Sequence, residues 1–101
     1  MMKTSVTEEN GMLIAAFEGR LDTAAAPQTE KDLAQVCENK DLDIVLDCTK
    51  LDYISSSGLR IFLSILKLAK ANGRHVSVVG LNDDLRNVFS MTGFINLFDI
   101  K

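Results

Sequence analysis

The sequence predicts an α/β fold, because strand-like and helix-like segments alternate along the chain. Residues 42–48, LDIVLDC, form a continuous aliphatic run typical of a strand that is buried on both faces under helices. Residues 59–73 combine strong helix formers with a terminal Asn72-Gly73 stop. The predicted order is ββαβαβαβ. An opening hairpin followed by helical crossovers indicates a mixed β-sheet with helices packed on it.

The opening hairpin is predicted from residues 3–9 and 12–19. Asn10-Gly11 separates the two segments, and this dipeptide supplies the positive φ values of a tight turn. We therefore expect the first two strands to be antiparallel neighbours.

A first helix is predicted within residues 19–40. Asp22 or Thr23 is the expected cap, and Pro27 falls in an early turn, where its missing N–H costs nothing. Three apolar residues, Leu33, Val36 and Cys37, are spaced as they would be on one face of a helix.

Three further elements complete the predicted order. Residues 75–80 read as a strand, residues 82–93 as a helix with two acids in its first turn, and residues 94–100 as a last short strand.

Length and composition favour one compact domain spanning residues 1–101, with 47% hydrophobic residues and a net charge of −3. This charge balance offers no basic field for nucleic acid. Cys37 and Cys48 match no metal-ligand spacing, so no metal or cofactor is expected. The N-terminus lacks the apolar run of a signal peptide, and no apolar stretch approaches the roughly 20 residues that span a bilayer. We expect a cytoplasmic protein without a membrane segment.

Three consecutive serines mark the candidate site, because they fall between a buried strand and the helix that follows it. Ligand sites and switches collect at the carboxyl ends of strands in open α/β sheets. One serine is enough to cap a helix, a contribution of about 0.5–2 kcal/mol. A helical wheel turns Ser55 toward the apolar arc and Ser56 toward the polar side, whereas Ser57 lies at the edge of the polar stripe. Ser56 is therefore the exposed hydroxyl and Ser57 the second choice.

A phosphate on a serine at this position would be tolerated by the helix, because the N-terminal end of a helix dipole is positive. Phosphorylation adds a charge of about −1.5 to −2. The serine loop is thus suited to a local, reversible switch.

Three segments resemble a STAS domain, in particular the stand-alone anti-sigma factor antagonists. They are GRLDTAAA at 19–26, LDIVLDCTKLDYISSSGLRIFL at 42–63 and VFSMTGFINLFDI at 88–100. The likeness covers nearly the whole chain, and the segment that leads into SSSGLR is its most specific part.

The resemblance implies a protein that, when unphosphorylated, binds an anti-sigma factor that is also an ATP-dependent serine kinase, so that a sigma factor is freed. The kinase then phosphorylates the loop serine, which weakens the complex, and a metal-dependent serine phosphatase restores it. Alignment with the family motif places the phosphoacceptor at Ser56. Asp22 matches a family aspartate beside the phosphorylation site, although it is also a candidate helix cap.

Two features depart from the family pattern. Ser55 stands where the best-known members carry an aspartate, so an acidic group that could help shape kinase recognition is absent. The sequence also ends at Lys101, shortly after the last predicted strand, whereas many relatives continue into a further helix.

The helix at 59–73 has an apolar arc wider than the stripe of roughly 100° that one sheet face requires. The surplus must pack on another helix or on a partner, and Leu63 beside Arg60 and Lys67 borders Ser56. Simple core packing is the competing interpretation of Leu63. The full set of predicted partner-binding residues is Asp22, Ser55, Ser56, Ser57, Gly58, Arg60, Leu63 and Lys67.

The sequence argues against an enzyme. His75 is the single histidine, and YISSSGL lacks the first glycine of a hydrolase nucleophile elbow. No P-loop pattern is present. Two alternatives to the antagonist remain open: a STAS interaction module in another assembly, such as a stressosome-like or lipid-transport complex, or a STAS domain that binds a small ligand.

Overall fold

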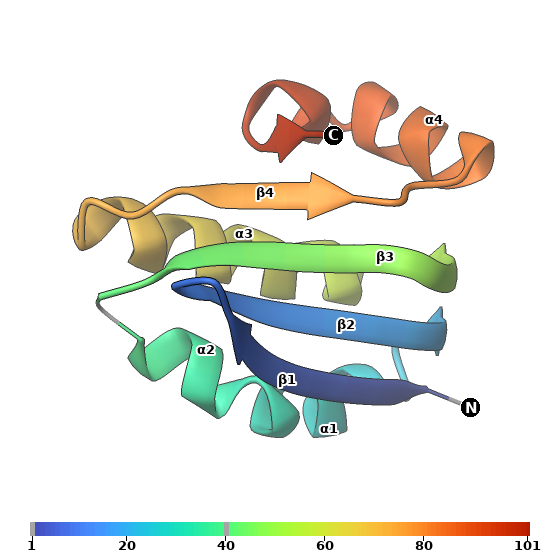
Figure 1. The fold of residues 1–101 in the computed structure, drawn as a ribbon. Helices are drawn as coiled ribbons and strands as arrows, with labels where there is room; N and C mark the ends of the chain where they lie inside the picture. Colours follow the sequence, from blue (N-terminus) through green and yellow to red (C-terminus); the bar gives the residue numbers. More distant parts are fainter. Residues whose placement is uncertain (1, 40) are drawn as a thin grey trace.

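The computed structural model describes residues 2–39 and 41–101, so Met1 and Lys40 lie outside the described residues. It contains a mixed sheet in the order β1-β2-β3-β4-β5 (Figure 1). β1 pairs with β2 antiparallel, and the other neighbours are parallel. The strands are β1 Lys3–Glu9, β2 Met12–Leu21, β3 Asp43–Ile54, β4 Val76–Val79 and β5 Asp99–Ile100. The predicted α/β class with a mixed sheet is confirmed.

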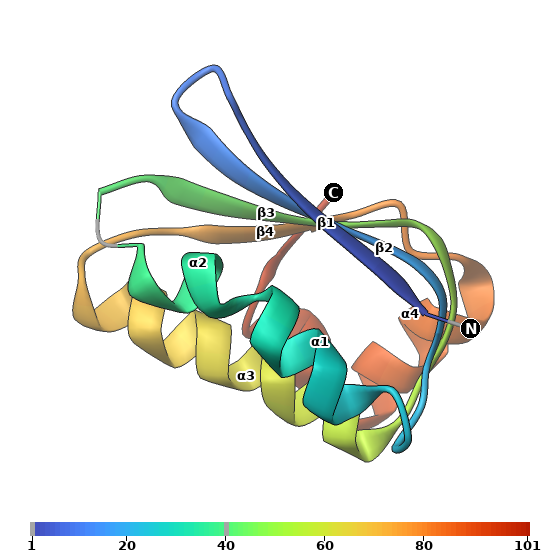
Figure 2. The ribbon, with the colours of Figure 1, turned by 90° about the horizontal axis from the view of Figure 1, so that it is seen from below.

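The helices all lie on one face of the sheet, as the view along it shows (Figure 2). They are α1 Ala26–Asp32, α2 Ala34–Glu38, α3 Ser56–Ala71 and α4 Asp83–Met91, followed by a 3-10 turn, η1 Phe94–Asn96. The prediction that β3 is buried on both faces is therefore wrong. Ile44, Leu46 and Cys48 are buried under the helices, whereas Val45 and Asp47 on the other face are only partly covered.

The opening hairpin is confirmed, with Asn10 and Gly11 at φ angles of 53° and 75°. Positive φ at both central residues is the backbone of a type I′ turn, whose twist matches that of the flanking strands.

The predicted first helix is divided into α1 and α2, which meet at Leu33 with φ −94° and ψ 8°. Asp22 accepts a hydrogen bond from the N–H of Ala25 at 2.9 Å, so its carboxylate closes the turn that leads into α1. Thr23 is exposed and does not act as the cap. Pro27 lies in the first turn, as predicted. The last predicted residue, Lys40, lies outside the described residues.

The predicted strand at 94–100 is wrong over its first half, which forms the turn η1. Gly93, at φ 79°, reverses the chain after α4. Phe94 then packs edge-on against Phe89 with ring centroids 6.2 Å apart, and Phe98 lies 6.1 Å from the same ring. Burial of these rings overrides the extended conformation, so only Asp99–Ile100 pairs with β4.

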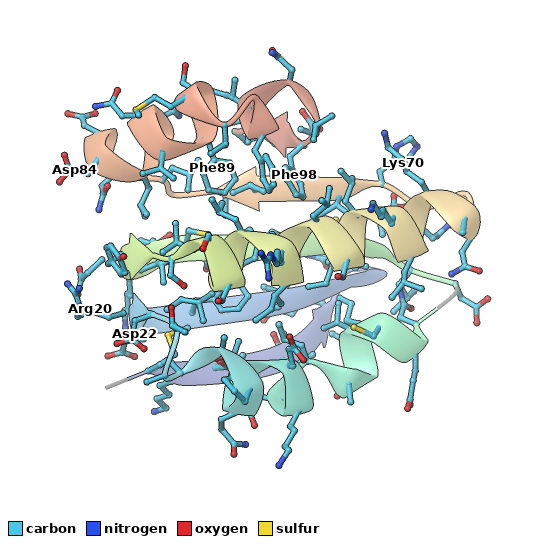
Figure 3. The ribbon with its side chains drawn as sticks, turned by 180° about the vertical axis from the view of Figure 1, so that it is seen from behind. Arg20, Asp22, Lys70, Asp84, Phe89 and Phe98 are labelled. Carbon is cyan, nitrogen blue, oxygen red and sulfur yellow. The ribbon has the colours of Figure 1, made fainter. Side chains whose placement is uncertain are left out.

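The core lies between the sheet and the helices, with Phe62 of α3 at its centre. This ring is fully buried and meets Phe17 at 5.1 Å, Phe89 at 6.1 Å and Phe98 at 6.4 Å between ring centroids. Figure 3 shows Phe89 and Phe98 near α4 and β4. The aromatic cluster joins α3 to β2, to α4 and to the segment before β5, and it fixes the helix on the sheet.

The wide apolar arc of α3 is used largely inside the domain. Ile61 is buried and lines a hollow of about 270 Å³ together with Leu33 of the α1–α2 corner and Cys37 of α2. Leu68, in contrast, is 41% exposed. Part of the surplus therefore packs on neighbouring helices.

Candidate functional site

Ser55 is the cap of α3. Its hydroxyl oxygen accepts a hydrogen bond from the N–H of Gly58 at 3.2 Å, and its side chain is buried. Its own N–H donates to the carbonyl oxygen of Leu21 at 2.8 Å, which ties the serine loop to the end of β2. The structural role that one serine was expected to fill thus belongs to Ser55.

Ser56 and Ser57 stand outside this cap. Ser56 is exposed at the first helical position of α3, and Ser57 is half-buried at the second. The wheel prediction that Ser56 is the exposed hydroxyl is confirmed. The Ser56 hydroxyl is therefore accessible from solvent without unfolding of the helix.

Asp22 lies at the same edge of the sheet because β2 and β3 end in register. Leu21 pairs with Ile54 as the last residues of the two parallel strands. Asp22 and Ser55 are the residues that follow this pair, so the chain brings them side by side. Figure 3 shows Asp22 at the end of the sheet where α3 begins. Its half-buried carboxylate is held by the hydrogen bond from Ala25.

Gly58 lets α3 approach the ends of β2 and β3. A Cβ atom at this position would come within 2.7 Å of Ile54 Cγ1 and of Leu21 Cγ. Both neighbours are buried, so neither has room to move away. Gly58 therefore positions the serine loop through packing.

Replacing Gly58 by valine should lower the free energy of unfolding by about 1–3 kcal/mol, because the added atoms overfill a packed core. We also expect faster amide hydrogen exchange at Ser55, since the loop must move away from Leu21. Chemical denaturation and exchange NMR measure the two effects. Ser64→Val, at an exposed position of α3, matches the β-branched substitution without the overlap. Equal effects of the two variants would contradict this role for Gly58.

The side chains of the predicted stripe share one side of α3. Arg60 and Lys67 are exposed and lie on the same side of the helix as Ser56. Leu63, between them, is partly buried against the core. One part of the Leu63 side chain packs inward and the rest is available at the surface, so its contact with a partner stays a prediction.

A cation–π pair beside the serine loop was not predicted. The Arg20 guanidinium lies 4.4 Å from the centre of the Tyr53 ring. The two residues are register partners directly before Leu21 and Ile54. The sequence carried no local signal for this pair, because the register of β2 against β3 is what brings the two residues together.

Other candidate chemistries find little support in the described residues. Within residues 2–39 and 41–101 no group of three or more His, Cys, Asp or Glu residues is placed to hold a metal ion. Burial raises the pKa of the Cys48 thiol to about 12, and burial also raises the pKa of Cys37, with Glu30 adding to the shift. Neither environment favours a reactive thiolate. In the same two ranges, no helix has both the length and the apolar character needed to cross a membrane.

Comparison with known proteins shows which family the chain belongs to. The model of the STAS domain matches residues 3–101. A protein of Bordetella bronchiseptica, provisionally named the anti-sigma factor antagonist BtrV, is 35% identical over 98% of this chain and 85% of its own length. An anti-sigma factor antagonist from Mycobacterium paratuberculosis has a similar structure, with a TM-score of 0.89 at 21% identity, covering 99% of this chain and 85% of its own.

A third similar structure is that of SpoIIAA of Bacillus in its phosphorylated form. It has a TM-score of 0.74 at 16% identity and covers 98% of this chain and 91% of its own. At this level of identity the likeness concerns the fold. The STAS family model and the similarity to BtrV both extend over almost the whole chain. The chain therefore belongs to the STAS domain family.

Proposed function

We propose that this protein is an anti-sigma factor antagonist that is switched by phosphorylation of Ser56. The unphosphorylated form binds an anti-sigma factor that is also a serine kinase, and a sigma factor is thereby freed in the cytoplasm. Phosphorylation of Ser56 weakens the complex, and a metal-dependent serine phosphatase restores the binding form. The name of the BtrV relative supports the antagonist role.

The different environments of the three serines are the observation that supports the proposal most strongly. Ser55 is occupied as the helix cap, Ser57 is half-buried, and Ser56 presents its hydroxyl at the surface. A modification at Ser56 changes the surface charge while the cap and the packing of Gly58 stay in place. SpoIIAA, which shares this fold, has been solved in a phosphorylated form, so the fold accommodates a phosphate.

The charges around Ser56 suit a protein interface that a phosphate can disrupt. Arg60 and Lys67 on α3 offer cations to a partner, and the adjacent Asp22 offers an anion. Charged groups at the rim of an interface mainly set specificity and the rate of association. A new dianion among them changes the electrostatic match without altering the fold.

The first experiment is intact-mass and phosphopeptide analysis of the protein isolated from its own cells, grown with and without stress. We expect one phosphate on Ser56, with an occupancy that changes with conditions and is lost in Ser56→Ala. Ser57→Ala is the matched control and should leave the occupancy unchanged. Three unmodified serines under every condition would overturn the phosphorylation switch and favour a constitutive STAS interaction module.

Leu63→Asp should weaken binding to the anti-sigma factor kinase of the same cells more than tenfold, because it places an unpaired carboxylate within the apolar part of the stripe. Calorimetric titration of the unphosphorylated protein measures this effect. Leu68→Asp, at an exposed apolar residue of the same helix, is the control and should retain affinity. Thermal melting must accompany both measurements, since Leu63 also packs inward. A folded Leu63→Asp variant with unchanged affinity would remove Leu63 from the interface.

A further inference from the structure

Arg60 lies one helical turn after Ser56 on the exposed side of α3. Residues four apart in a helix have Cβ atoms about 5–6 Å from each other. Side chains in a helix also tend to lean toward its N-terminus, which is the direction in which Ser56 lies from Arg60. A guanidinium is therefore within reach of a group attached to the Ser56 hydroxyl.

This guanidinium has no competing acid on its own helix. The first turn of α3 contains no acidic residue. Among residues 2–39 and 41–101, the ion pair that forms joins Lys101 to Asp99, in the C-terminal segment. Arg60 is exposed, and a new anion could attract it without breaking an existing salt bridge.

A phosphate on Ser56 would lie at an edge of the sheet that already carries several carboxylates. Arg20, a cation near the end of β2, is stacked on Tyr53. The carboxylates at the ends of β2 and β3 and at the start of α4 come from Asp22, Asp52, Asp83 and Asp84. A phosphate on Ser56 adds to this negative field, and Arg60 is the cation that the helix geometry places beside it.

We propose that Arg60 is the intramolecular counter-ion of a phosphate on Ser56, an inference that rests on the proposed function. A guanidinium and a phosphate form charge-assisted hydrogen bonds in a geometry that suits both groups. Phosphorylation then changes the partner-facing surface twice: it adds a dianion, and it withdraws the Arg60 cation from the groups offered to the partner. The second change makes the phosphorylated surface a poorer match than the added charge alone would.

The test uses the full chain with phosphoserine inserted at position 56 during translation. A 31P NMR pH titration measures the second pKa of the phosphate, which is ordinarily about 6. We expect Arg60→Gln to raise this pKa by roughly 0.3 unit or more, the size expected for loss of one ion pair at this helical spacing. Arg60→Lys should retain most of the wild-type value because it keeps the positive charge.

Lys67→Gln is the matched control, because it removes the same charge from the same exposed side two turns further from the phosphate. It should change the pKa of the phosphate by no more than about a third of the change that Arg60→Gln produces. An unchanged pKa in Arg60→Gln, or an equal shift in Lys67→Gln, overturns the proposal. Circular dichroism of each phosphorylated variant verifies the fold, and a phosphorylated wild type that unfolds overturns it as well.

The result is independent of any kinase, since the phosphate is installed during synthesis. If the NMR titration shows that Arg60 is not the counter-ion, the proposed phosphorylation of Ser56 in cells is unaffected. Failure of the proposed function appears instead as the absence of phosphate at Ser56 in protein from its own cells.

Discussion

Replacing Phe62 by alanine should lower the free energy of unfolding by about 3–5 kcal/mol. The ring is fully buried and contacts three other aromatic rings, which come from β2, α4 and the segment before β5. Its removal leaves a cavity that these rigid neighbours cannot fill. Because native domains are stable by only about 5–15 kcal/mol, the variant should retain a small part of its stability.

Urea denaturation measures the Phe62 effect, with a lower midpoint and an unchanged slope as the expected result. Leu68→Ala on the same helix is the control, and its 41% exposure predicts a change within about 0.5 kcal/mol. A Phe62→Ala loss no larger than that of Leu68→Ala would mean that α3 is not anchored by the aromatic cluster.

Replacing Gly80 by alanine should cost about 2–5 kcal/mol. The residue follows β4 at φ +76°, a backbone conformation that costs an L-residue roughly 1–2 kcal/mol. The added Cβ would also lie 2.7 Å from the backbone nitrogen and 2.8 Å from the Cα of Thr49, and it would overlap the Thr49 hydroxyl. Overpacking of this kind adds about 1–3 kcal/mol. Thr49 cannot readily yield, since Asp47 accepts a hydrogen bond from its N–H at 3.0 Å.

Gly73 separates the cost of the backbone conformation from the cost of the overlap with Thr49. It has nearly the same backbone conformation, φ +71°, but no atom lies within 4 Å of a Cβ built on it. Gly73→Ala should therefore lose only the backbone part, and thermal or urea denaturation of both variants gives the difference. Equal losses would show that contact with Thr49 contributes nothing.

The predictions that succeeded depend on local rules. Asn10-Gly11 fixes a turn because few other dipeptides adopt positive φ at two successive positions. The stop at Asn72-Gly73 and the cap at the start of α3 follow from backbone groups that the helix itself cannot satisfy. The selection of Ser56 as the exposed serine needed only the 100° step of a helix.

The predictions that failed depend on contacts between distant segments. The aliphatic run in β3 does not reveal whether the second face of the sheet is covered, because that depends on where every crossover helix is placed. Residues 94–96 have strand-like composition, yet the burial of Phe94 and Phe98 against Phe89 favours a turn. The interruption at Leu33 likewise places two short helices against α3 and β1, where a single straight helix was expected.

The sequence by itself determined the α/β class, the opening hairpin and the choice among the three serines, because each follows from periodicity or from the backbone preferences of neighbouring residues. Only the tertiary structure decided that all helices cover one face, that Asp22 adjoins the serine loop and that Arg20 stacks on Tyr53. The last two depend on the register of β2 against β3. Register arises from packing and hydrogen bonds between segments more than 30 residues apart, so no local pattern encodes it.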